Sequence, residues 1–271
     1  MQGRLTSPTS HKIQEFPWEN WQKEFEILNQ INLRLLEWTL DLENLDHNPI
    51  ISDNNSEEIK NLKQKYQIGI NSITFDNLLD APLHRVNTRT NMMTSLDKFQ
   101  KIVKKLVFNG IEIGVVPLVK ESGKDNKETL EKLIEILFQI HPFLKSVGFK
   151  IALECELDLV QIEFLESQTS NLNFIGFNFD MGNSASIGNN PSDEIGIIGK
   201  RLFNVHIKDR LKNGKTVPLG EGSVDFYAVE KVLRDYKYLG NMILQAARQK
   251  SQDEIETILK YIKFCSDYGW I

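Results

Sequence analysis

The chain has 271 residues, of which 41% are hydrophobic and 25% are charged, and its formal net charge at pH 7 is −5. No apolar run approaches the roughly 20 residues that a membrane span needs, and the start lacks the apolar stretch of a secretory signal peptide. Nucleic-acid affinity depends on Lys and Arg that neutralise phosphates, so an acidic balance without a basic block argues against a general nucleic-acid binder. We expect a cytoplasmic protein with Cys155 and Cys265 as free, buried thiols.

Short β-branched runs alternate with amphipathic helical stretches along the whole sequence, which is typical of βαβ units on a parallel sheet. Helices are predicted over Lys127–Leu144, Ala228–Tyr236 and Asp253–Tyr268, where apolar residues recur at helical spacing. A barrel of eight βα units needs roughly 250 residues. The sequence therefore predicts an α/β fold, a single (β/α)₈ TIM barrel over residues 1–271, with eight strands: Gln2–Leu5, Leu35–Leu40, Ile68–Phe75, Ile111–Pro117, Lys150–Glu154, Phe174–Phe179, Leu202–Lys208 and Met242–Gln245.

Local signals mark helix starts and two weak points. Ser56 precedes two glutamates and Thr94 precedes Asp97, as N-terminal capping residues do. Pro191 begins a stretch typical of a first helical turn. The first strand is short, which predicts an imperfect seam where the barrel closes. The segment Asp76–Asn91 has no regular period and is predicted to be a functional or mobile loop.

The carboxyl ends of the predicted strands carry polar residues in the second half of the chain. In barrels of this class the active site lies at that end of the strands. Four residues end or directly follow the fifth to eighth strands: Glu154, Asp180, His206 and Gln245. Glu154 and Asp180 are 26 positions apart, as are Asp180 and His206, which is about the length of one βα unit. We therefore expect these three side chains to face one another across neighbouring strand ends.

Glu154, Asp180 and His206 together offer oxygen and nitrogen ligands for a divalent ion. The mixed set suits Mn, Mg, Co or Zn and does not choose among them. A strand-terminal Glu on its own is more often a surface or capping residue, so the prediction depends on all three residues at barrel spacing. An ion bound there would polarise a carbonyl and stabilise an ene-diolate, which eases removal of a proton from the adjacent carbon.

Several stretches follow a recognisable pattern: Ile151–Glu154, Phe179–Asn183, Asn204–Asp209 and Pro218–Phe226. They resemble the sugar-phosphate isomerase/epimerase family of xylose-isomerase-like barrels, and most of all its hexulose-phosphate and ribulose-phosphate epimerases. The VHIKD and PLGEGSVDF stretches are the most specific. Gln14–Trp21 and Leu36–Thr39 are also similar to these proteins, so the resemblance covers nearly the whole chain.

The resemblance implies a metal held by Glu154, Asp180, His206 and the residue that ends the eighth strand. In the epimerases of this group that residue is a glutamate, and two glutamates serve as base and acid on opposite faces of the substrate. Gln245 stands at this position here. A glutamine can ligate a metal through its carbonyl oxygen but cannot take a proton near pH 7. The expected base is therefore Glu154, and Lys208, beside His206, is a second catalytic candidate.

Further residues are candidates for binding the substrate. Glu37, at the end of the second strand, is a candidate second base or substrate ligand by its position alone. Trp38 belongs either to a sugar-binding wall or to the core, and Asn183 either to the site or to a capped turn. The amides around Gly220 either cradle a phosphate or form a turn. Positive charge for a phosphate would come from Arg4, Arg210, Lys212, Lys215 or Arg248.

Three functions are compatible with these residues. The first is a divalent-metal-dependent isomerase or epimerase that acts on a ketose or ketose phosphate by proton abstraction next to a carbonyl. The second is a metal-dependent phosphodiesterase of the endonuclease type, which shares this barrel but draws on more His and carboxylate ligands. The third is a barrel that has lost catalysis and binds a sugar or a partner, an alternative that Gln245 keeps open. The expected partner is a small sugar or sugar phosphate; barrels of this kind often form homo-oligomers, although the sequence marks no interface.

Overall fold

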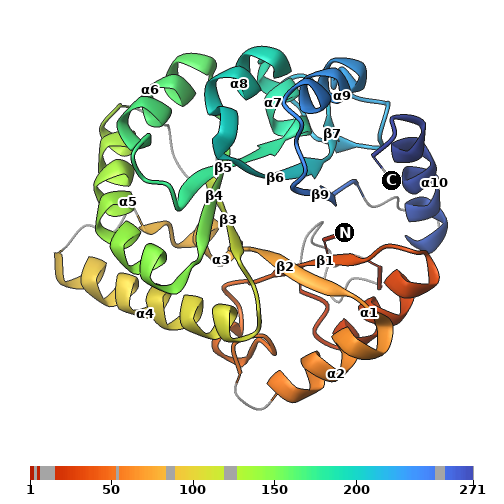
Figure 1. Ribbon diagram of the computed structural model, residues 1–271, viewed down its shortest axis with the longest axis horizontal. Coiled ribbons are helices and arrows are strands. Elements are labelled where there is room, and N and C mark those ends of the chain that lie inside the picture. The colour runs from red at the N-terminus through yellow and green to blue at the C-terminus, as the bar shows by residue number, and fades with distance from the viewer. Residues whose placement is uncertain are drawn as a thin grey trace.

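The computed structural model describes residues 1–2, 5–6, 16–52, 55–83, 89–118, 127–247 and 254–270. Within them, seven parallel strands form one sheet in the order β1-β2-β3-β4-β5-β6-β9, which curves into a barrel with helices on its outside (Figure 1). The strands are β1 (Leu35–Thr39), β2 (Gly69–Thr74), β3 (Ile113–Leu118), β4 (Lys150–Cys155), β5 (Ile175–Asp180), β6 (Leu202–Ile207) and β9 (Asn241–Leu244).

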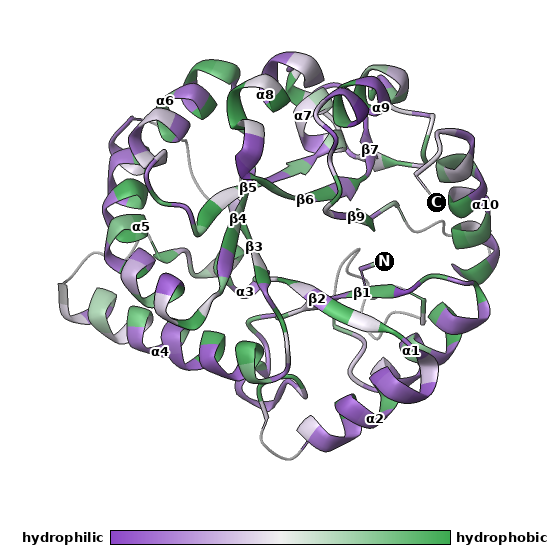
Figure 2. Ribbon diagram, in the orientation of Figure 1, coloured by the Kyte–Doolittle hydropathy of each residue, from purple (hydrophilic) through white to green (hydrophobic). Residues whose placement is uncertain are grey.

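Helices connect successive strands, as βαβ units require. They are α1 (Trp21–Gln30), α2 (Ser56–Tyr66), α3 (Asn77–Asp80), α4 (Arg89–Phe108), α5 (Lys127–Val147), α6 (Leu159–Thr169), α7 (Met181–Ile187), α8 (Pro191–Ile198), α9 (Phe226–Asp235) and α10 (Glu254–Asp267), with short turns η1 (Leu45–His47) and η4 (Gly199–Arg201). Hydrophobic and hydrophilic residues alternate along the helices, as in amphipathic elements that pack on a sheet (Figure 2). The three helices predicted from periodicity correspond to α5, α9 and α10.

The first two residues of the chain close the barrel. The amide of Glu37 donates to the carbonyl of Met1 at 2.8 Å, and the amide of Gln2 donates to the carbonyl of Leu244 in β9 at 3.2 Å. Gln2 also forms an isolated parallel bridge with Glu37 in β1. The predicted (β/α)₈ barrel with a short first strand is therefore confirmed, and the first strand is reduced to this bridge.

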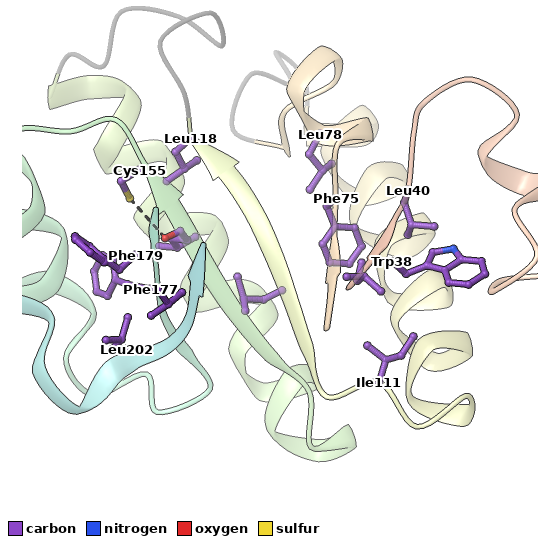
Figure 3. Packing of buried hydrophobic residues seen from close by; sticks show 14 of the residues in the cluster. Trp38, Leu40, Phe75, Leu78, Ile111, Leu118, Cys155, Phe177, Phe179 and Leu202 are labelled. Carbon is purple, nitrogen blue, oxygen red and sulfur yellow. Dashed lines mark hydrogen bonds between the residues drawn. The ribbon is translucent and has the colours of Figure 1, made fainter. Parts of the chain in front are cut away.

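Side chains alternate between the two faces of each strand, so that one face packs on the helices and the other fills the barrel. In β5, Phe177 and Phe179 belong to the buried hydrophobic layer (Figure 3). The intervening Asn178 and Asp180 are buried as well, but they form hydrogen bonds inside the barrel. The barrel interior is therefore polar at the carboxyl ends of β4 to β6, where the predicted site lies.

One predicted helix start is wrong, one is displaced by one residue and one is confirmed. The helix α4 begins at Arg89, so Thr94 lies within it, and the Thr94 hydroxyl donates to the carbonyl of Thr90 at 3.1 Å. A threonine hydroxyl bonds the carbonyl four residues earlier in a helix as readily as it caps a new one, which explains the error. Pro191 is the first residue of α8, as predicted, and α2 begins at Ser56, although Asn55 and not Ser56 stands at its N-cap position.

Several elements were not predicted from the sequence. The helix α3 and the first turn of α4 lie within Asp76–Asn91, the segment expected to be a loop, of which residues 84–88 are outside the described part. A small antiparallel hairpin, β7 (Asp209–Arg210) and β8 (Thr216–Val217), follows β6.

Among the described residues, no helix has both the length and the apolar character that crossing a membrane would require.

Candidate metal centre

Glu154, Asp180 and His206 lie together at the carboxyl ends of β4, β5 and β6. All three are buried, and one ligand atom of each lies within 4.8 Å of those of the other two. The register of the sheet places them there: Asp180 pairs with His206, and Glu154 pairs with Asn178, two residues before Asp180. The three side chains therefore converge, as their spacing predicts.

The fully buried imidazole of His206 lies between carboxylates. Its Nε2 is 2.8 Å from Oε1 of Glu37. Its Nδ1 is 3.0 Å from Oε2 of Glu154 and 3.9 Å from Oδ2 of Asp180. A carboxylate that holds one ring nitrogen fixes the orientation of the ring and aims the other nitrogen. Glu37 therefore directs Nδ1 of His206 toward Glu154 and Asp180.

Opposite charges set the protonation of this cluster. Burial acts to lower the pKa of His206, but the carboxylates of Glu37 and Glu154 outweigh it and raise the pKa to about 10. Burial acts to raise the pKa of Glu154, but the charges of His206 and Lys208 outweigh it and lower the pKa to about 2. Burial raises the pKa of Asp180, which the charge of Lys208 only partly offsets. A cation bound at Nδ1 of His206 would have to displace the proton there, because only the neutral ring is a ligand.

Asp180 ends β5 and also caps α7. Its Oδ1 accepts the backbone N–H of Asn183 at 2.8 Å, and its Oδ2 lies 3.1 Å from Nζ of Lys208. An N-cap side chain of this kind is fixed relative to the first helical turn. One oxygen is thereby held by the backbone, while the other faces Lys208 and the imidazole of His206.

The donor set fits a divalent cation. Among the described residues, the buried atoms Nδ1 of His206 and Oε1 of Gln245 have no hydrogen bond of good geometry, although Nδ1 lies 3.0 Å from Oε2 of Glu154. Such orphaned atoms are rare in folded proteins, and a cation would satisfy both together with the carboxylates of Glu154 and Asp180. The backbone places Gln245 next to this group, because the backbone N–H of Gln245 donates to the carbonyl of Ile207, the residue after His206, at 2.9 Å. These residues could therefore hold Mn, Mg, Co or Zn.

Glu37 and Trp38 occupy positions different from those expected. Glu37 is fully buried and its two oxygens accept three hydrogen bonds, so it supports His206 and is not placed as a second base. Trp38 points to the other face of β1. The centroid of its ring lies 5.6 Å from the ring centroid of Trp21 in α1, and its Nε1 donates to Oδ1 of Asn48 at 2.8 Å. The structure thus assigns Trp38 to the core beneath α1 and not to a sugar-binding wall.

The amides around Gly220 are engaged within the chain. Those of Gly220 and Gly222 each donate to Oδ2 of Asp209 at 2.9 Å, and that of Val224 donates to Oδ1 at 3.2 Å. A Cβ on Gly222 would lie 2.1 Å from Oδ1 of Asp209, so the close approach requires glycine. The carboxylate of Asp209 occupies the place expected for a phosphate, which favours the turn over the phosphate cradle at Gly220.

Two other candidates for substrate binding lie beside the cluster. Nδ2 of Asn183 donates to Oε1 of Glu154 at 2.9 Å, and Nη1 of Arg210 donates to Oδ1 of Asn183 at 2.8 Å. The side chain of Asn183 thus reaches the site, while its backbone N–H serves the turn. Arg4 and Arg248 lie outside the described residues.

Sequence reasoning missed Asn178 and Asn204, which connect the carboxylates inside the barrel. Asn178 donates to Oε2 of Glu154 at 3.2 Å. Asn204 donates to Oδ1 of Asn178 at 2.9 Å and to Oε2 of Glu37 at 3.1 Å. Together with His206 they close a ring of buried polar groups. Each asparagine stands two residues before a predicted ligand and so shares its face of the strand, a period-two signal visible in the sequence.

A buried carboxyl group near the centre gives a prediction for stability. Burial raises the pKa of Glu194 to about 7, although Ser184 and Asn189 donate hydrogen bonds to it. The stabilising contribution of the protonated group is therefore complete below pH 4.5 and is lost as the pH rises through 7, by an amount on the order of 3 kcal/mol. We expect Glu194→Gln to lose less stability than the wild type between pH 5 and pH 8 in urea unfolding. Equal losses would contradict the prediction, and Glu163→Gln on the exposed face of α6 is the control.

Solved structures share this fold at low sequence identity. The IOLI protein with a bound zinc atom has a TM-score of 0.75 and 17% identity, over 94% of this chain and 94% of that one. A D-psicose 3-epimerase in the presence of D-fructose has a TM-score of 0.74 and 12% identity, over 93% and 94%. The 3-keto-D-glucoside 4-epimerase YcjR from Escherichia coli has a TM-score of 0.69 and 16% identity, over 92% and 96%. These likenesses establish the fold alone.

Sequence comparison gives one short match and one long one. The Escherichia coli (strain K12) protein named "Putative L-ribulose-5-phosphate 3-epimerase SgbU" is 27% identical over 88 residues, which are 30% of this chain and 31% of that protein. The profile of the xylose isomerase-like TIM barrels matches residues 19–265, a span that contains every strand of the sheet and the Glu154–Asp180–His206 group. The chain therefore belongs to the xylose isomerase-like TIM barrel family.

Proposed function

We propose that the protein is a divalent-metal-dependent isomerase or epimerase that removes a proton next to the carbonyl of a ketose or ketose phosphate. The orientation of the His206 imidazole carries the proposal. Glu37 contacts Nε2, so that Nδ1 faces Glu154 and Asp180. Buried charges are costly to a fold unless they are paired or bind a metal. A cluster in which one ring nitrogen and two carboxylates converge in the interior is therefore better explained by an ion site than by stability.

Each group has a role in the proposed reaction. Glu154, Asp180, His206 and Gln245 would hold the ion, which when bound polarises the carbonyl of the substrate and stabilises the ene-diolate. The charges of His206 and Lys208 lower the pKa of Glu154 in the metal-free protein, so its carboxylate is ionised at neutral pH, and in the proposed reaction it accepts the proton from the neighbouring carbon. Lys208 brings a positive charge beside Asp180, where it can attract the negative oxygen that develops on the substrate.

The path of the proton decides between isomerisation and epimerisation. A single base that returns the proton to the adjacent carbon on the same face produces an aldose from a ketose. Inversion of one carbon needs a second group that delivers a proton from the opposite face. Gln245 cannot act as that acid near pH 7, and Glu37 is occupied by three donors. Among the described strand-end residues this leaves Glu154 as the base, which favours isomerisation.

Exchange with solvent deuterium tests the proposal. Protein loaded with Mn²⁺ is incubated in D₂O with ketoses and their phosphates, among them D-fructose, D-psicose and L-ribulose 5-phosphate, and the sugars are examined by NMR. We expect deuterium next to the carbonyl of at least one sugar, and only when a divalent ion is present. Absence of exchange with Mn, Mg, Co and Zn across the panel would contradict the proposal. Stabilisation by a sugar without exchange would favour a sugar-binding barrel, the second candidate, which Gln245 supports.

Gln245→Glu is expected to tighten Mn²⁺ binding about tenfold, because a carboxylate adds charge to the ligand set where the amide adds none. Without metal, the extra buried carboxylate should lower the melting temperature, since it adds an unpaired charge. Added Mn²⁺ should reverse this loss. Isothermal titration and thermal unfolding measure both effects, and Gln139→Glu on the exposed face of α5 is the matched control. An unchanged affinity would mean that the side chain at position 245 does not reach the ion.

A further inference from the structure

The guanidinium of Arg210 is held by the chain itself. Its Nε and Nη2 donate to the carbonyl of Gly214 at 3.1 and 3.0 Å. Its Nη1 donates to Oδ1 of Asn183 at 2.8 Å and pairs with the carboxylate of Glu156, the residue that follows β4. Every nitrogen of the group therefore has a partner within the protein. This pattern fits a residue that positions its neighbours better than one that waits for a substrate phosphate.

The contact with Arg210 determines which way the amide of Asn183 faces. A guanidinium has donors and no acceptor, so only the Oδ1 end of Asn183 can meet Nη1. The Nδ2 end is then turned to Glu154, where it donates to Oε1 at 2.9 Å. With Oε1 engaged, the other oxygen, Oε2, lies 3.0 Å from Nδ1 of His206 and also accepts a hydrogen bond from Asn178 at 3.2 Å.

We propose that Arg210 is a positioning residue, which acts through Asn183 to hold Oε1 of Glu154 and present Oε2 to the metal. The inference rests on the proposed metal centre, and it concerns the geometry of one ligand rather than the identity of the substrate. Arg210 is thereby withdrawn from the residues expected to bind a phosphate. Arg210 holds Glu154 in place through Asn183, as Glu37 holds His206 in place directly.

The surrounding backbone is built to bring Arg210 close to Asn183. Arg210 lies on β7, and the hairpin that it begins is fixed to α7 by the amide of Asn213, which donates to the carbonyl of Ser186 at 2.7 Å. Gly182, just before Asn183, leaves room for this approach: a Cβ there would lie 3.2 Å from Cγ of Arg210 and closer still to Lys208, at 2.9 Å. The hairpin therefore contacts α7 near its end, at Ser186, and the backbone before the hairpin packs closely on the start of α7, at Gly182.

A purely electrostatic role for Arg210 makes the opposite prediction. Arg210→Gln removes a positive charge and the ion pair that Arg210 forms with Glu156. If charge alone mattered, a divalent cation would bind more tightly to this variant. If Arg210 positions Glu154, the amide of Asn183 becomes free to turn and the cation should bind more weakly. The sign of the change separates the two roles.

Mn²⁺ affinity, measured by electron paramagnetic resonance of the free ion, provides the test. We expect Arg210→Gln to weaken binding about tenfold, which is typical of a lost partner behind a metal ligand. Arg210→Lys should weaken it as well, because one ammonium group cannot reproduce the planar fork that meets both Asn183 and Gly214. Arg234→Gln, on the exposed surface of α9, is the matched control and should bind as the wild type does.

A double-mutant cycle asks whether the effect passes through Asn183. In an Asn183→Ala background, Arg210→Gln should change the Mn²⁺ affinity by less than about twofold, since the connecting amide is absent. Circular dichroism and melting curves show whether each variant is folded, and Arg210→Lys carries the test if Arg210→Gln is not. Tighter or unchanged binding in the folded variants, or additive effects in the cycle, would overturn the inference. A wild-type protein that binds no divalent ion would instead overturn the metal centre, and the inference with it.

Discussion

Asp180→Asn is expected to weaken Mn²⁺ binding by at least about 100-fold, because it removes an anionic ligand, whereas residues behind the ligands are worth 10- to 100-fold. The same change should leave the fold nearly intact. Asn is as good an N-cap as Asp, so the bond from the amide of Asn183 to Oδ1 can be kept. The raised pKa of Asp180 indicates that its charge is held at a net cost, even beside Lys208. We therefore expect the stability of the metal-free protein to change by less than about 1 kcal/mol.

Asp158→Asn is the matched control for this experiment. Asp158 caps α6, and its side chain accepts the backbone N–H of Gln161 at 2.9 Å, so the substitution repeats the same capping change at an exposed position. It should alter neither Mn²⁺ affinity nor the stabilisation by Mn²⁺ in thermal unfolding. An Asp180→Asn variant that binds Mn²⁺ within a few-fold of the wild type would remove Asp180 from the ligand set.

The repeating part of the structure could be predicted from the sequence. The two βα units from β4 to β6 have nearly the same length, so the strand-end residues Glu154, Asp180 and His206 could be brought together from their spacing alone. The alternation of Phe177 and Phe179 with Asn178 and Asp180 also follows from a rule of period two. The spacing of these residues specifies the edge of the sheet at which their side chains lie, and this edge was predicted correctly.

The contacts across the barrel could not be predicted in the same way. Glu37 and His206 are 169 positions apart. Their side chains meet inside the barrel because the sheet curves round and brings β1 opposite β6. No local pattern tells whether a buried Glu at the end of a strand will serve a substrate or a neighbouring His. The two interpretations of the loop around Gly220 could not be separated for a related reason. Its glycines suit a phosphate and a carboxylate equally well, and the chain supplies the carboxylate of Asp209 itself.

Glu154→Gln is expected to slow the exchange of solvent deuterium into the substrate by about 100- to 10,000-fold, the range that a positioned general base contributes. The variant must be assayed at saturating Mn²⁺, because the substitution also disturbs the ligand set. Asn183 donates to the Oε1 position, so the carbonyl of the new Gln would occupy it. The amide NH₂ would then face Nδ1 of His206, in place of an oxygen that lies 3.0 Å away. Glu163→Gln is the control, and exchange within threefold of the wild type would remove Glu154 as the base.

The comparison of Glu154→Gln with Asp180→Asn separates the loss of a base from the loss of a ligand. Both variants should bind Mn²⁺ weakly, since each lacks one anionic oxygen ligand. At saturating Mn²⁺, Asp180→Asn keeps the carboxylate of Glu154 and should recover much of its exchange. Glu154→Gln should not recover at any Mn²⁺ concentration, because an amide cannot accept the proton. If both variants recover together, Glu154 serves only to hold the ion and the proton must leave by way of another group.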